Sequence, residues 1–112
     1  MANDRRPQLD RVIHEHTRLS ILAYLASSER AEVDFPKVKS DLELTAGNLS
    51  VQLRNLEEAG YVRISKRFVG NKPNTRISLT ARGSKALGDY LDEMEALIRR
   101  LKGGSNGSDT AP

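Results

Sequence analysis

The chain contains no cysteine and no long run of apolar residues. Without cysteine it cannot form a disulfide, a thiolate zinc site or an iron–sulfur cluster, and it has no cysteine nucleophile. Its longest apolar runs fall far short of the roughly 18 residues that a membrane-spanning helix needs. The charged residues of segment 1–7 are not followed by the apolar stretch of a signal peptide. The sequence therefore predicts a cytoplasmic protein that does not enter a membrane.

Arrangements typical of catalysis or metal binding are also lacking. Glu57 and Glu58 are neighbours on a predicted helix, so their carboxylates point apart and do not form an acid–base pair. His14 and His16 are two residues apart, which on a helix separates them by about 200°, too far to chelate one metal ion together unless the helix breaks between them. No glycine motif that binds phosphate is present. We therefore expect no enzyme activity, no metal and no cofactor.

Acidic residues are missing from one basic segment. The whole chain carries a formal net charge of +3. This excess arises between residues 62 and 76, because the rest of the chain holds about as many basic as acidic residues and is slightly acidic. The charged residues of the segment are all basic: Arg63, Lys66, Arg67, Lys72 and Arg76. A local basic patch on a nearly neutral body is typical of a protein that binds a polyanion at a defined place, and nucleic acid is the commonest such partner.

Apolar residues at helical spacing predict two helices near the start of the chain, broken near His16 and Thr17. The second helix carries an apolar stripe over residues 19–25, and Thr17 is expected to be its N-cap. The first helix follows Pro7 and carries three apolar residues: Leu9, Val12 and Ile13.

The next elements form a predicted helix-turn-helix. A short strand over residues 32–35 leads into a third helix that begins at Pro36. A fourth helix lies within residues 44–60, because Thr45 is a good N-cap and Gly60 a natural end. Its apolar residues repeat at intervals of four and three: Leu49, Leu53 and Leu56. The short link between these two helices predicts a steep angle between them.

Alternating apolar residues then predict a hairpin, followed by a last helix. The strands cover residues 62–68 and 77–79, with Phe68 on the apolar face and a long turn-rich tip at 70–75. Thr80 is expected to cap the last helix. That helix carries a coiled-coil-like apolar seam: Leu87, Leu91, Met94, Ile98 and Leu101.

The order helix, helix, strand, helix, helix, strand, strand, helix is that of a winged helix-turn-helix, a mainly α fold of the α+β class. Four segments are familiar in this order: HEHTRLSIL at 14–22, LTAGNLSVQL at 44–53, LEEAGYV at 56–62 and LTARG at 79–83. Together they resemble the MarR and ArsR families of transcriptional regulators, and the small MarR-like subgroup most closely. The resemblance covers roughly residues 9–101. It implies a dimeric repressor or activator, with the fourth helix in the major groove and the hairpin, or wing, on the flanking backbone or minor groove.

The chain departs from this family pattern in three respects. Metal-sensing ArsR proteins use cysteine-rich sites, which this sequence excludes. MarR wings commonly carry an acidic residue beside an arginine pair, whereas this tip reads GNKPNTR at 70–76. Larger MarR proteins enclose an effector pocket with longer terminal helices. The sequence thus allows a small-molecule effector without implying one.

The side of the fourth helix opposite its leucines presents amides and small residues. Asn and Gln can pair bidentately with adenine, and Val51 can contact a thymine methyl group. Bases on the wing supply attraction to phosphate that is independent of sequence. The predicted DNA-binding residues are Thr45, Gly47, Asn48, Ser50, Val51, Gln52, Arg54, Asn55, Arg63, Arg67, Lys72 and Arg76.

The seam of the last helix is longer than the core of so small a domain needs, which favours dimerisation. A symmetric homodimer would read a palindromic operator. These patterns divide the chain into a flexible start (1–8), a winged domain (9–80), a dimerisation helix (81–102) and a disordered tail or non-native extension (103–112).

The alternative function is that of a winged-helix module that binds proteins and not specific DNA, because fold alone does not fix function. Such a module would expose large apolar residues where this sequence has amides and bases.

Overall fold

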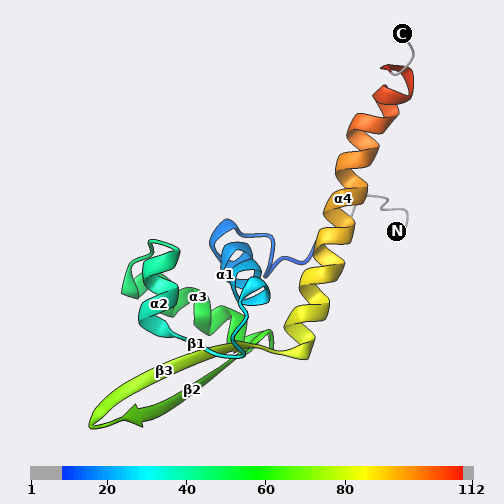
Figure 1. Ribbon diagram of the computed structural model, residues 1–112. Helices are drawn as coiled ribbons and strands as arrows, with labels where there is room; N and C mark the ends of the chain where they lie inside the picture. Colours follow the sequence, from blue (N-terminus) through cyan, green and yellow to red (C-terminus); the bar gives the residue numbers. More distant parts are fainter. Residues whose placement is uncertain (1–8, 110–112) are drawn as a thin grey trace.

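The computed structural model describes the backbone of residues 9–109 and the side chains of residues 9–103 (Figure 1). Its elements, in chain order, are α1 (His16–Ser27), β1 (Val33–Asp34), α2 (Phe35–Asp41), α3 (Ala46–Glu58), β2 (Val62–Val69), β3 (Lys72–Leu79) and α4 (Ala81–Asp109). The strands form one antiparallel sheet in the order β1-β3-β2. In Figure 1 the first three helices cluster beside this sheet, the hairpin extends on one side, and α4 projects on the other. This is the predicted winged helix.

The segment before α1 forms a turn where the sequence predicted a helix. Oδ1 of Asp10 accepts hydrogen bonds from the backbone N–H groups of Val12 at 2.9 Å and Ile13 at 3.2 Å. An aspartate that binds nearby backbone donors in this way favours a turn over a helix. Ile13 is nevertheless fully buried. The apolar spacing therefore predicted the wrong kind of element for this segment.

One of the two predicted N-caps in the amino-terminal half is wrong and one is confirmed. The N-cap of α1 is Glu15, not Thr17, and its carboxylate accepts a hydrogen bond from the N–H of Arg18 at 2.8 Å. Thr45 is the N-cap of α3, with its Oγ1 accepting from the N–H of Asn48 at 3.0 Å. Threonine is preferred over glutamate at N-caps in general, so residue type alone predicted the wrong N-cap for α1.

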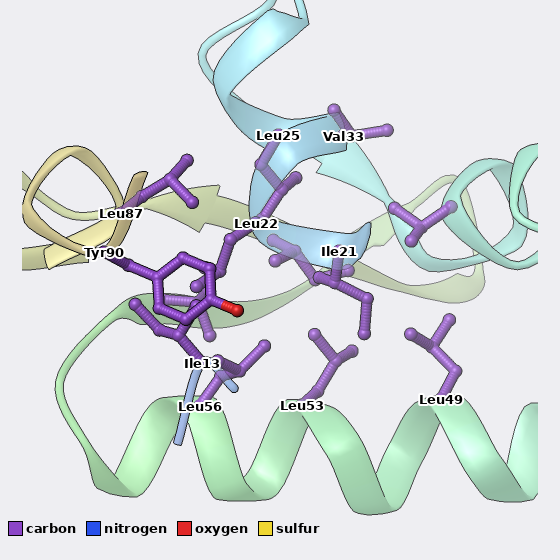
Figure 2. Packing of buried hydrophobic residues seen from close by; sticks show 13 residues of the cluster. Ile13, Ile21, Leu22, Leu25, Val33, Leu49, Leu53, Leu56, Leu87 and Tyr90 are labelled. Atoms are coloured by element: carbon purple, nitrogen blue, oxygen red, sulfur yellow. The ribbon is translucent and has the colours of Figure 1, made fainter. Parts of the chain in front are cut away.

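The hydrophobic core lies between α1, α3 and the start of α4 (Figure 2). Figure 2 shows the side chains of Leu49, Leu53 and Leu56 pointing from α3 toward α1. All three are buried, as their spacing predicted, and Leu87 and Tyr90 of α4 close the same cluster. Each such burial stabilises the fold by about 1.5–3 kcal/mol. The core thus fixes one face of α3 and leaves the other face to solvent.

The wing is longer and tighter than predicted. Its strands pair as far as Val69 with Lys72, so the turn contains only Gly70 and Asn71 where the sequence predicted a tip over 70–75. Gly70 has a φ of 67°, and glycine is the residue that most readily adopts this conformation in a hairpin turn. Phe68 is 71% exposed, contrary to its predicted place on a buried face, because the hairpin extends beyond the helical body (Figure 1).

The last helix begins as predicted and runs further than expected. Oγ1 of Thr80 accepts a hydrogen bond from the N–H of Gly83 at 2.9 Å, which is the predicted cap. The helix then continues to Asp109, so the structure describes residues 103–109 as helical, where the sequence predicted a tail. The predicted flexible segment 1–8 and residues 110–112 lie outside the described residues.

Candidate nucleic-acid interface

The face of α3 opposite the core is exposed and mainly polar. Val51 is 48% exposed, so its methyl groups are accessible to a thymine methyl in a major groove. Gln52 and Asn55 lie half buried at the edge of the face. The other predicted DNA-binding residues of this region are exposed: Thr45, Gly47, Asn48, Ser50 and Arg54. The structure therefore leaves the predicted helix residues open to a ligand along α3.

A hydrogen-bond network beside this face includes Arg18, which the sequence prediction missed. Nη1 of Arg18 donates to Oε1 of Gln52 at 2.8 Å, and Nε2 of Gln52 donates to Oδ1 of Asn48 at 3.1 Å. Arg18 is itself held in place because its Nε donates to the backbone oxygen of Val12 at 2.6 Å. Arg18 and Gln52 are 34 residues apart, so no local spacing in the sequence signals this contact.

Two tyrosines fix the turn that carries this backbone oxygen. The Tyr61 hydroxyl donates to Oδ2 of Asp10, and the Tyr90 hydroxyl lies 2.8 Å from Nδ1 of His14. Burial, followed by the hydrogen bond to Asp10, raises the pKa of Tyr61 to about 12. Tyr61 therefore keeps its proton and its role as a donor at neutral pH. Tyr61 ties the turn to the end of α3, and Tyr90 ties it to α4. The turn so fixed positions Arg18 through the Val12 oxygen.

The basic residues of the wing fall into two groups. Arg67 and Arg76 lie against Glu32, which precedes β1. Nη2 of Arg67 is 3.1 Å from both carboxylate oxygens of Glu32, and Nη1 of Arg76 is 4.0 Å from one of them. Because such partly exposed ion pairs contribute only about 0–1 kcal/mol, phosphate can compete with the carboxylate for both arginines. The remaining bases of the wing are exposed: Arg63, Lys66 and Lys72.

The predicted apolar seam of α4 is divided between the core and the surface. Leu87 is 6% exposed and belongs to the core of its own domain, and Met94 is half buried against that core. Leu91, Ile98 and Leu101 are 50%, 46% and 70% exposed. The apolar stripe that is open to another molecule therefore begins at Leu91 and continues along the projecting part of α4 (Figure 1).

Neither a cluster of metal ligands nor a membrane-spanning helix occurs in the described part of the chain. There, no three His, Asp or Glu side chains gather closely enough to hold a metal ion. None of the helices between residues 9 and 109 combines the length and apolar character needed to cross a membrane.

Comparison with known sequences identifies the family. Residues 17–98 match the family model described as a winged helix DNA-binding domain. The chain belongs to this family. An uncharacterized protein of Methanocaldococcus jannaschii is 33% identical over 92 residues, which cover 82% of this chain and 98% of the relative.

Solved structures place the fold among the MarR-like regulators. A transcriptional regulator homologue protein from Pyrococcus horikoshii OT3 matches with a TM-score of 0.72 and 29% identity, over 80% of this chain and 87% of its own. A MarR family transcriptional regulator from Streptomyces coelicolor, solved in complex with DNA, matches with a TM-score of 0.67 and 22% identity, over 81% and 60%. The protein thus has the MarR-like winged helix fold that the sequence resemblance implied.

Proposed function

We propose that this protein is a sequence-specific transcriptional regulator that binds double-stranded DNA as a homodimer, with α3 in the major groove and the wing on the neighbouring backbone or minor groove. The observation that carries the proposal is the exposed polar face of α3 on the same chain as a basic, projecting wing. Amides match base edges, and cations match phosphates. The role requires neither catalysis nor a cofactor, and we place it in the cytoplasm with the DNA.

The exposed part of the α4 seam supports the homodimer. One recognition helix reads only a few base pairs, too few to specify a site in a genome. Two domains related by a two-fold axis would read a palindrome whose half-sites lie about 34–36 Å apart, and would combine their affinities. Leu91, Ile98 and Leu101 supply an apolar contact on the element that projects from the winged domain.

Binding to duplex DNA is expected to weaken steeply as salt rises. Each cation that neutralises a phosphate makes the slope of log affinity against log salt more negative by about 0.9. Lys72→Ala should therefore reduce the magnitude of this negative slope by about 1 and weaken specific and random duplexes alike. Asn48→Ala should instead cost about 1–3 kcal/mol on the preferred site and little on random duplex. Fluorescence anisotropy at several salt concentrations measures both effects.

Lys85→Ala is the matched control for Lys72→Ala. It removes the same charge from an exposed position on α4, where Lys85 pairs with Asp89 at 2.8 Å, and should leave the salt slope unchanged. Equal losses for Asn48→Ala on specific and random DNA would show that α3 is not the reading helix. A folded sample that binds no duplex at low salt would contradict the proposed function itself.

Glu32→Gln is expected to strengthen binding to any duplex. The change removes the negative charge that Arg67 and Arg76 contact, so neither guanidinium group is held by an ion pair to Glu32 and both are more available to phosphate. We expect a gain of about three- to tenfold in affinity at low salt and a steeper salt slope. Glu95→Gln frees Arg99 from a similar pair on α4 and should change neither quantity. An unchanged salt slope in Glu32→Gln would indicate that these arginines do not reach the DNA.

The tip of the wing favours a second candidate, a module that binds another protein. Phe68 and Val69 are 71% and 55% exposed, and large exposed apolar residues are typical of protein interfaces. The salt titration separates the two candidates. A protein-binding module would bind no duplex at low salt, and Lys72→Ala would have no DNA affinity to reduce.

A further inference from the structure

Arg18 determines which way the amide of Gln52 faces. A guanidinium group has hydrogen-bond donors and no acceptor. The Gln52 atom that lies 2.8 Å from Nη1 of Arg18 must therefore be the carbonyl oxygen Oε1. The second bond of Arg18, from Nε to the oxygen of Val12, keeps the guanidinium in place. The orientation of the amide follows from the chemistry of its partner.

The orientation of Gln52 in turn determines that of Asn48. With Oε1 facing Arg18, Nε2 of Gln52 faces Asn48 at 3.1 Å, and it can bond there only to the carbonyl oxygen Oδ1. Both amide oxygens are then engaged within the protein. Each oxygen has then used one of its two lone pairs, so what remains for a ligand is mainly N–H groups: the second hydrogen on Nε2 of Gln52 and both hydrogens on Nδ2 of Asn48.

We propose that Arg18 is a positioning residue that makes this amide pair a set of donors and thereby gives it a preference for guanine. In the major groove guanine presents two acceptors, O6 and N7, which match two neighbouring donors. Adenine requires one amide that accepts from N6 while it donates to N7, and each amide oxygen here already accepts one hydrogen bond within the protein, which makes it the weaker partner for N6. The inference rests on the proposed function and replaces the adenine contact expected from the sequence.

The proposal is tested by selecting binding sites from a random duplex library. The relevant base is the one whose preference disappears in Asn48→Ala. We expect guanine there for the wild-type protein. Arg18→Met removes the donors and keeps most of the side-chain length, so it frees Oε1 of Gln52 and should reduce the preference for guanine over adenine by about tenfold. Arg18→Lys retains a donor and should keep guanine.

Gln52→Glu tests the same chain of bonds without removing Arg18. A carboxylate at position 52 still accepts from Arg18 but has no N–H, so Nδ2 of Asn48 must turn toward it and expose Oδ1. The exposed acceptor should abolish the preference for guanine. Ala46→Asp adds the same charge at the exposed first residue of the same helix, outside the amide pair, so it should lower affinity for all duplexes and keep guanine.

The outcomes separate this inference from the proposed function. If the folded wild-type protein selects no site, the proposed function fails. If it selects a site with adenine at this position, or if folded Arg18→Met and Gln52→Glu both keep the guanine preference, DNA binding stands and the role of Arg18 is refuted. Circular dichroism and thermal melting establish which variants are folded. Should Arg18→Met prove unfolded, Gln52→Glu decides alone.

Discussion

Leu91→Arg is expected to sediment as a monomer at concentrations where the wild-type protein is a dimer. Leu91 is 50% exposed on α4, at the point where the apolar seam leaves the core. An arginine there would place an unpaired charge in a contact formed by apolar side chains, which an interface tolerates poorly. Binding to a palindromic site should fall by about 100-fold, because the two half-sites no longer act together. Weak binding to random duplex should remain.

Ala96→Arg is the control for this change. At about 100° per residue, position 96 lies on the side of α4 opposite the seam, and it is exposed. The variant adds the same charge and should remain a dimer with full affinity for the palindrome. Circular dichroism should show both variants folded, since the buried cluster does not include either position. A dimeric Leu91→Arg protein, or a wild-type protein that stays monomeric at high concentration, would refute this interface.

Helix α3 was predictable because its signals are local. Thr45 lies directly before the helix and accepts the hydrogen bond that its residue type favours. The three buried leucines of α3 follow helical periodicity, so the opposite face could be deduced without knowledge of any partner. Gly60 ends the element with a φ of 83°, a conformation in which other residues are strained.

Contacts between distant segments were not predictable in the same way. The bond from Arg18 to Gln52 and the pair of Arg67 with Glu32 join residues 34 and 35 apart, and neither residue type nor spacing specifies such partners. The strand alternation placed Phe68 on the apolar side of its strand. Burial of that side depends on how far the helical body extends, which only the three-dimensional arrangement shows (Figure 1).

Gly83 is another position whose importance appears only in the structure. Gly83 lies at the start of a helix, where many positions accept a larger residue, so the neighbouring sequence does not signal that glycine is required. A Cβ atom at Gly83 would lie 2.1 Å from the carbonyl oxygen of Tyr61 and 2.9 Å from Cδ1 of Leu79. The same oxygen accepts a hydrogen bond from the N–H of Thr80 at 3.1 Å. Tyr61 follows the end of α3, so Gly83 lets α4 begin in direct contact with the segment that follows α3.

Gly83→Ala is therefore expected to lower the free energy of unfolding by about 3 kcal/mol, because a backbone oxygen cannot move aside as a flexible side chain can. Gly88→Ala is the matched control on the same helix. No atom lies within 4 Å of a Cβ built at Gly88, so alanine should raise the free energy of unfolding by about 0.5–1 kcal/mol through its higher helix propensity. Urea denaturation measures both changes.

The same contact links stability to DNA binding. In a homodimer joined through α4, the angle between α3 and α4 sets the distance between the two recognition helices, and a shift at Gly83 changes that angle. Folded Gly83→Ala protein, examined well below its melting temperature, should therefore lose affinity for the palindrome while binding a single half-site normally. A variant as stable as the wild-type protein would show that the Tyr61 carbonyl does not pack against this glycine.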